Sequence, residues 1–266
     1  MEFIITDDNT KIYYKIQGCG TPVILVHGFT ATHDVFRVLQ KLLSKNHMAI
    51  SYDLRGHGLS SESSNITLGV LAQDLRELIE KLELKNIILV GWSLGASVIF
   101  EYIKRYGFNN IMKLSIIDSS PKIINDKSWD LGLYHGKYYI EDALEDLNKM
   151  ISDWNNYSEE FMSKMAPELT KTQLRIAIEA VSINNKYAMI DIWKSLIYKD
   201  YRDILKEITI PALLMFGGKS TLYSTRVGEY LKSNIKESGL IVFEQNTHLL
   251  VQESPIGINR ALKEFI

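Results

Sequence analysis

A serine between two glycines is the side chain of this sequence best suited to nucleophilic chemistry. Ser93 lies at the centre of the segment Gly-Trp-Ser-Leu-Gly (91–95), which follows the apolar run 86–90 and precedes a helix-like stretch, 96–102. The pattern G-x-S-x-G at a strand-to-helix turn exposes its serine on a strained turn, the nucleophile elbow. Glycine on both sides lets the strand and the helix pack closely. The start of the helix also favours negative charge beside the Leu94 N–H. The segment therefore predicts a nucleophilic serine.

A serine hydroxyl is a weak nucleophile until a neighbouring base removes its proton, and histidine is the commonest base. Among six histidines, His248 has the most suitable position, because it follows the last predicted strand in the loop 243–255. We therefore predict that His248 is the base. Three others are expected on the surface or in loops, although the third could approach a substrate: His33, His47 and His135.

An alternation of strands and helices must position these side chains. Two short runs with turn residues between them, Glu2–Thr6 and Lys11–Gln17, predict a β-hairpin. Continuous apolar runs predict strands that are buried on both faces, and stretches of helical periodicity separate them. The predicted strands are 23–26, 48–52, 86–90 and 113–117, and the predicted helices are 34–43, 67–82 and 96–102. This alternation predicts a parallel sheet with helices on both faces.

The alternation stops at Pro121. From 122 to 199 the pattern is predominantly helical, and this segment is rich in tryptophan, tyrosine and methionine. The alternation then resumes, with strands at 212–216 and 240–243 and helices near 225–234 and from about 255. A helical insert between two strands is most simply a cap over their carboxyl ends, where open α/β sheets bind ligands. We therefore expect a core of residues 1–121 and 200–266 and a helical cap of residues 122–199.

Four motifs in this order resemble the α/β-hydrolase superfamily. The tripeptide His-Gly-Phe (27–29) follows one predicted strand and the stretch 53–60 follows the next, while the Ser93 elbow and the His248 loop follow two others. The resemblance covers the chain outside the helical insert. It implies an α/β-hydrolase fold: a mostly parallel eight-stranded sheet with helices on both faces and the helical cap inserted after strand 6.

The resemblance also assigns roles to several residues. It implies that the N–H groups of Phe29 and Leu94 form an oxyanion hole, which stabilises a tetrahedral acyl-transfer intermediate. His248 comes last among the catalytic residues, as in the superfamily's chain order. His27 and His57 lie in motifs that are usually structural and order the loops around the oxyanion hole.

The acid that usually completes such a site is missing from its expected position. The superfamily places it just after the strand 212–216, where this sequence has Ser220 and no carboxylate in the stretch 217–227. Asp118 is the best substitute, because it ends the strand expected beside that of Ser93. Some members of the superfamily take their acid from this neighbouring position.

Two other interpretations of these carboxylates stay open. Asp118 could cap the turn that follows it, which is a common role for aspartate. Glu244 is a weaker candidate for the acid, because it lies where a strand ends. Since a neutral Ser220 cannot stabilise a positive imidazole, we expect Ser220→Ala to have little effect. The predicted catalytic residues are Ser93, Asp118 and His248.

Composition argues against several classes of partner. Of the 266 residues, 46% are hydrophobic and 23% charged, and the formal net charge is −2, so nothing favours nucleic acid or an anionic membrane. Cys19 is the single cysteine, and no His or Cys cluster has metal-ligand spacing, so we expect no metal and no cofactor. No apolar run approaches the roughly 18 residues of a membrane span, and the start does not resemble a signal peptide. We therefore expect a cytoplasmic protein.

The resemblance implies a serine hydrolase of the carboxylesterase type, which cleaves an ester or a related acyl compound through an acyl-enzyme. Methionine and aromatic side chains in the helical insert suit a small, partly apolar, ester-like substrate. The alternative is a ligand-sensing or partner-binding protein on the same scaffold, with slow or no turnover, which the uncharged Ser220 would favour. Labelling of Ser93 by a fluorophosphonate would separate the two.

Overall fold

Eight strands form one sheet in the computed structural model, which describes residues 2–62 and 64–266. They are β1 (Glu2–Ile5), β2 (Lys11–Gln17), β3 (Pro22–Val26), β4 (Met48–Tyr52), β5 (Ile87–Trp92), β6 (Ile111–Ile117), β7 (Ala212–Gly217) and β8 (Ser238–Phe243). Their order across the sheet is β1-β2-β4-β3-β5-β6-β7-β8. β2 pairs in antiparallel fashion with β1 and with β4, and the other pairs are parallel. The prediction of a mostly parallel eight-stranded sheet is confirmed.

The central strands are apolar throughout because both faces of the sheet are covered. In β3, Ile24 and Val26 belong to one hydrophobic cluster, whereas Val23 and Leu25 belong to another. All four side chains are fully buried. Successive side chains of a strand point to opposite faces, so the two clusters are the packed cores on the two sides of the sheet.

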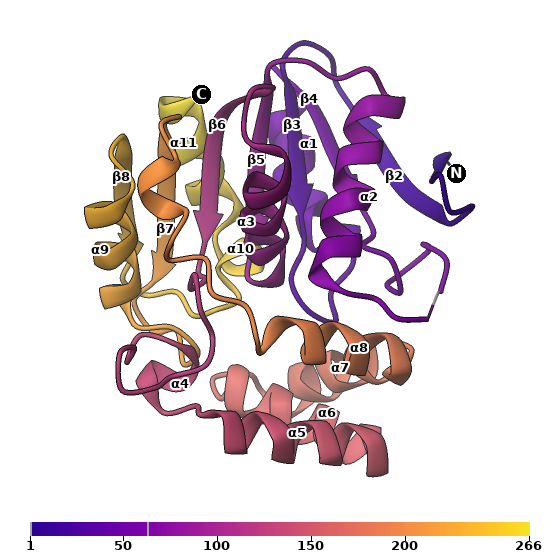
Figure 1. Cartoon of the computed structure of the whole chain (residues 1–266), viewed down its shortest axis with the longest axis vertical. Helices are drawn as coiled ribbons and strands as arrows, with labels where there is room; N and C mark the ends of the chain where they lie inside the picture. Colours follow the sequence, from indigo (N-terminus) through magenta and orange to yellow (C-terminus); the bar gives the residue numbers. More distant parts are fainter. Residues whose placement is uncertain (1, 63) are drawn as a thin grey trace.

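Helices cover both of these faces (Figure 1). The cluster around Ile24 includes residues of α2 (Leu68–Lys81), α3 (Leu94–Tyr106) and α9 (Thr225–Asn234). The cluster around Val23 includes residues of the short helix η1 (His33–Phe36), of α1 (Arg37–Leu43), of α10 (Leu250–Glu253) and of α11 (Pro255–Phe265). This arrangement confirms the prediction of helices on both faces.

A second group of helices lies between β6 and β7 in the chain. It consists of α4 (Leu133–Gly136), α5 (Ile140–Ser152), α6 (Trp154–Met165), α7 (Lys171–Ser182) and α8 (Lys186–Leu196), and a short helix, η2 (Leu205–Glu207), leads back to β7. Helices α5 to α8 gather beyond one end of the sheet (Figure 1). α5 packs against α6 and α8, and α6 packs against α7. They therefore form a layer of their own at that end.

None of the helices in the described residues is both long and apolar enough to cross a membrane. Even α2, with 14 residues, is shorter than the about 20 residues that a bilayer requires.

Candidate active site

Ser93 stands on a sharp turn between β5 and α3. Its φ of 54° lies in the left-handed region, which residues other than glycine rarely adopt. A Cβ atom on Gly91 would lie 2.7 Å from Ala96 N, and one on Gly95 would lie 2.0 Å from Val26 O. Both distances are far shorter than van der Waals contact. Strand and helix therefore pack this closely only because both positions are glycine, as the elbow pattern predicts.

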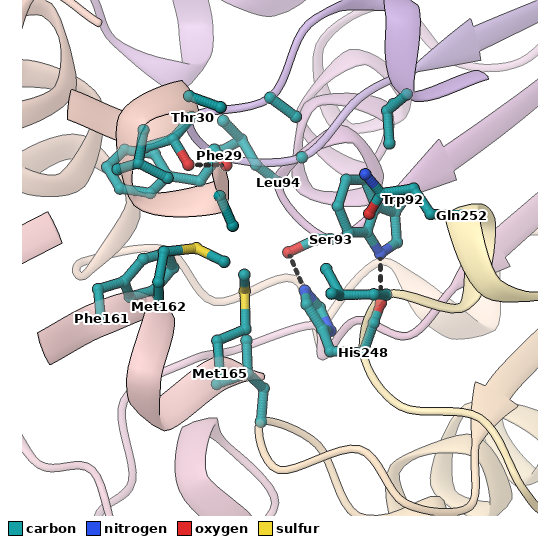
Figure 2. Close-up of a pocket in the computed structure, with 18 of the residues that line it drawn as sticks. Phe29, Thr30, Trp92, Ser93, Leu94, Phe161, Met162, Met165, His248 and Gln252 are labelled. Atoms are coloured by element: carbon teal, nitrogen blue, oxygen red, sulfur yellow. Dashed lines mark hydrogen bonds between the residues drawn. The ribbon is translucent and has the colours of Figure 1, made fainter. Parts of the chain in front are cut away.

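His248 lies in the loop after β8, and its ring faces Ser93 (Figure 2). The Ser93 Oγ is 3.1 Å from His248 Nε2, within hydrogen-bond reach. Trp92 Nε1 donates to the His248 carbonyl oxygen at 2.9 Å, and the two rings lie 5.4 Å apart. Glu253 fixes the same loop, because its carboxylate accepts the N–H and the hydroxyl of Thr247 at 2.7 and 2.6 Å. The imidazole is thus held in one orientation beside the serine.

Asp118 follows β6 directly and contacts the other nitrogen of the His248 ring. The Nδ1–H of His248 donates to Asp118 Oδ2 at 2.6 Å. An ionised carboxylate can only accept, so Nδ1 carries the proton and Nε2 is left to accept from the Ser93 hydroxyl. The N–H of Gly217 donates to Asp118 Oδ1 at 3.0 Å, and the Asp118 side chain is fully buried. The structure brings the three predicted side chains together in one hydrogen-bonded series.

Ser220 takes part in this arrangement, which the sequence reasoning missed. Its hydroxyl donates to Asp118 Oδ2 at 2.6 Å, although 102 residues separate the two in the chain. The signal was present, since Ser220 occupies the position where the superfamily usually has its acid. A neutral hydroxyl carries no charge for the imidazole, which is why the sequence alone predicts little effect of Ser220→Ala. The bond to Asp118 is a reason to expect an effect.

The weaker candidates lie elsewhere. Glu244 is exposed just beyond the end of β8. His27 and His57 are buried with their rings 5.0 Å apart, and burial lowers the pKa of both, that of His57 to about 3. Both are therefore neutral at pH 7. His27 Nδ1–H donates to Gly28 O at 2.8 Å and its Nε2 accepts the Leu54 N–H at 3.0 Å, so His27 joins the loops after β3 and β4.

The remaining histidines do not touch Ser93 or Asp118 through any hydrogen bond of the described residues. His33 contacts Asp53 through Nδ1 at 2.9 Å, and His135 donates from Nε2 to the Ser220 carbonyl oxygen at 2.7 Å. His33 and His47 are half-buried and His135 is exposed.

Phe29 and Leu94 lie beside Ser93 on the side away from His248 (Figure 2), and each has a backbone N–H group without a protein acceptor among the described residues. Leu94 is the first residue of α3, so its N–H has no partner within the helix. Phe29 lies in the loop after β3, and its ring packs against Phe161 and Trp193, with centroids 6.1 and 5.1 Å away. Within residues 2–62 and 64–266, neither N–H donates to a protein acceptor. Both N–H groups are therefore available to donate to a ligand.

A cavity of about 760 Å³ opens at Ser93. Loops after β3, β5, β7 and β8 form one wall, and α6, α7 and α8 contribute to the other, so the cavity lies at the carboxyl ends of the parallel strands. Figure 2 shows Met162 and Met165 of α6 directed toward the serine. This volume suits a small organic molecule. Its apolar lining from these helices includes Phe161, Met162, Met165, Ile176, Val181 and Trp193.

The cavity carries little charge. Among the described residues that line it, none is lysine or arginine, and the two carboxylates are Asp34 and Glu253. Glu253 is already engaged by Thr247, and Asp34 is exposed. In the described part of the chain, no group of three or more His, Cys, Asp or Glu side chains is arranged to hold a metal ion. The lining therefore offers an anionic ligand no cationic side chain.

A mostly parallel eight-stranded sheet with a serine on a strand-to-helix elbow defines the class of α/β hydrolases. The family model described as alpha/beta hydrolase fold matches residues 21–255. The chain therefore belongs to the α/β-hydrolase fold family, as the sequence motifs predict.

Individual relatives agree with this assignment. The AB hydrolase superfamily protein YisY of Bacillus subtilis (strain 168) is 27% identical over 270 residues, which cover 99% of this chain and 98% of that protein. A pimeloyl-[acyl-carrier protein] methyl ester esterase of Vibrio cholerae is 26% identical over 243 residues, 89% of this chain and 91% of its own. The solved structure of an esterase from Exiguobacterium antarcticum superposes with a TM-score of 0.90 at 25% identity, covering 99% of this chain and 98% of that one.

Proposed function

We propose that this chain is a serine hydrolase that cleaves a carboxylic ester, or a related acyl compound, through an acyl-enzyme intermediate. The observation that carries the proposal is the hydrogen-bonded series from Asp118 through His248 to Ser93, which ends at the cavity. The N–H groups of Phe29 and Leu94 beside the serine support it. The esterase names of two relatives agree with this class of reaction.

In the first half of the proposed reaction, His248 Nε2 takes the proton of the Ser93 hydroxyl as its oxygen attacks the carbonyl carbon of the ester. The carbonyl oxygen becomes an oxyanion that accepts from Phe29 N–H and Leu94 N–H, each worth about 3 kcal/mol in the transition state. The Asp118 carboxylate stabilises the positive imidazole. His248 then returns the proton to the leaving alcohol, and the acyl group stays on Ser93.

In the second half, a water molecule takes the place of the alcohol. His248 Nε2 accepts a proton from this water, whose oxygen attacks the acyl carbon while the same two N–H groups hold the oxyanion. The tetrahedral intermediate collapses, His248 protonates Ser93 Oγ, and the carboxylic acid leaves. The same machinery serves thioesters and lactones, so the proposal names acyl compounds as a class.

The substrate that fits this site is a small, uncharged and partly apolar molecule. Methionine and aromatic side chains from α6 and α8 surround the position of the acyl or alkyl group, and they adapt to irregular apolar shapes. A free carboxylate on the substrate would meet Asp34 and Glu253 without a cationic partner. We propose that the segment 122–199, which contains α4 to α8, acts as a cap that limits the size of the substrate.

Reaction with a fluorophosphonate and hydrolysis of p-nitrophenyl butyrate test the proposal. We expect stoichiometric labelling of Ser93, and we expect Ser93→Ala to lower kcat/KM by about 10⁴ or more. An unchanged melting temperature of the variant would show that the fold is intact. Near-normal hydrolysis by Ser93→Ala would contradict the assignment. A wild-type protein that binds esters but neither reacts nor turns over would support the sensor function instead.

A further inference from the structure

The carboxylate of Asp118 is held from the side of β7 as well as by His248. Ser220 Oγ donates to Asp118 Oδ2 at 2.6 Å, and the same oxygen accepts His248 Nδ1–H at 2.6 Å. Gly217 N–H donates to the other oxygen at 3.0 Å. We propose that Ser220 is a positioning residue whose hydroxyl fixes the Asp118 carboxylate against His248. The inference rests on the proposed hydrolase function.

The Ser220 hydroxyl is itself held in one direction. Tyr223 N–H donates to Ser220 Oγ at 3.3 Å, so an oxygen lone pair is engaged and the hydroxyl proton is directed to Asp118. The Ser220 N–H donates to Gly217 O at 3.2 Å, and the Ser220 carbonyl oxygen accepts from His135 at 2.7 Å. The side chain is 3% exposed, so water does not compete for it. Side chain and backbone of Ser220 are thus both fixed.

Asp118 needs this support because its backbone is strained and its side chain is shielded from water. Its φ is 43°, in the left-handed region, and its side chain is fully buried. A buried carboxylate is stabilised by donors that point at it, and hydrogen bonds to a charged group are stronger than those between neutral groups. Without the Ser220 hydroxyl, Oδ2 keeps only the bond to His248, and the carboxylate gains freedom to turn away from the imidazole.

The geometry also allows the carboxylate to come from the other strand. Ser220 Oγ and His248 Nδ1 lie at the same distance from Asp118 Oδ2. An aspartate at position 220 is longer than serine by one bond, so its carboxylate would extend from the place of the Ser220 hydroxyl toward the place that Asp118 Oδ2 now occupies. The side chains at positions 118 and 220 therefore meet at the carboxylate oxygen that contacts the imidazole, and they come from the neighbouring strands β6 and β7.

The first experiment compares Ser220→Ala with Thr221→Val on p-nitrophenyl butyrate. Thr221 is a matched control, because its hydroxyl donates to Met165 O and contacts none of the three catalytic side chains through a hydrogen bond of the described residues. We expect Ser220→Ala to lower kcat by about 10- to 100-fold with KM within about twofold, since it loses one bond to a charged group. Thr221→Val should stay within about twofold. Ser220→Cys, which keeps the volume with a weaker donor, should lie between wild type and Ser220→Ala.

The second experiment moves the acid. Asp118→Gly suits a φ of 43° and should lower kcat by about 10³ or more. Adding Ser220→Asp should raise the kcat of that variant at least about tenfold, as the new carboxylate reaches His248. Ser220→Asp alone should be less active than wild type, because two carboxylates would then share one site. Circular dichroism and thermal unfolding verify that each variant is folded.

The outcomes separate the inference from the proposed function. A Ser220→Ala variant with kcat within about twofold of wild type, or a double variant no more active than Asp118→Gly, would overturn the role of Ser220 while leaving the hydrolase function intact. A wild-type protein inert to both the ester and the fluorophosphonate would overturn the proposed function, and this inference with it.

Discussion

At the scale of single residues, the charge of Asp118 has the largest predicted effect on the rate. Its Oδ2 lies 2.6 Å from His248 Nδ1, next to the ring that becomes positive in the proposed reaction. Asp118→Asn replaces the acceptor with an amide whose NH₂ group donates to Nδ1, so the imidazole proton moves to Nε2. A protonated Nε2 cannot accept the hydroxyl proton of Ser93. We expect kcat to fall by about 10³ to 10⁴, measured on p-nitrophenyl butyrate.

Two controls accompany Asp118→Asn. Glu244→Gln, an exposed carboxylate at the end of β8, should leave kcat unchanged. The Asn variant should still fold, because asparagine tolerates the left-handed backbone at this position. Full activity of Asp118→Asn together with loss of activity in Glu244→Gln would reverse the assignment of the acid.

How far these residues can be predicted from the sequence depends on how local their signals are. Ser93 has its whole context within five residues, and His248 is placed by its position after the last strand. Asp118 was chosen by elimination and by the expected neighbourhood of two strands, β5 and β6, which the register confirms. The Ser220 hydroxyl bond depends on how the turn after β7 folds back over β6. No local pattern encodes that.

At the scale of elements, α7 forms part of the mouth of the cavity. Ile176 of α7 and Ile183, which directly follows that helix, line the cavity although they are 57% and 83% exposed, so the end of a long apolar chain would cover them. Replacing both with serine should raise KM for p-nitrophenyl laurate about 5- to 10-fold, because each buried methylene contributes about 0.8 kcal/mol. The KM for p-nitrophenyl butyrate, whose chain ends deeper in the cavity, should stay within about twofold.

Tyr198→Ser provides the matched surface change, since Tyr198 is 72% exposed and lies outside the described lining. It should alter neither KM value. An equal increase for the butyrate and the laurate in the double isoleucine variant would mean that α7 does not contact the distal part of the chain.

In the segment 122–199, the sequence predicts the type of secondary structure but not the boundaries of the helices. The strand at 23–26 was predicted within one residue because burial on both faces leaves a continuous apolar run. The segment 122–199 was predicted only as mainly helical, without boundaries. Its shortest helix, α4, contains Tyr134 and His135 at φ of 51° and 56°, conformations that follow from packing and hydrogen bonds across the fold. The helix predicted at 34–43 divides into η1 and α1.

At the scale of the whole molecule, two buried histidines link stability to pH. Burial lowers the pKa of His27 and brings that of His57 to about 3, whereas an unfolded histidine titrates near 6.5. Below pH 6.5 the unfolded chain takes up protons that the folded chain does not. The free energy of unfolding should therefore be greatest above that pH and fall as the pH drops toward 3, by about 1.4 kcal/mol per unit for His57. His27 adds to this loss until the pH reaches its own lowered pKa.

Urea unfolding at pH 7.5, 6.0 and 5.0 measures this dependence. His57→Asn keeps a donor for the Arg55 carbonyl oxygen, which accepts from His57 Nδ1 at 3.2 Å, and removes the titrating group. Its stability should fall less steeply with acid than that of the wild type. Parallel curves for the two proteins would show that His57 is not the source of the pH dependence.

Phe29 connects the loop after β3 to the helices of the segment 122–199. We propose that its N–H donates to the oxyanion, and its ring packs against Phe161 of α6 and Trp193 of α8. Asn184, between α7 and α8, also donates to the carbonyl oxygen of the adjacent Thr30 at 3.1 Å. Loosening of these helices by heat would displace that N–H while the sheet remained folded, since local openings require less free energy than global unfolding. Hydrolysis should then cease several degrees below the melting of the sheet, and cooling should restore it.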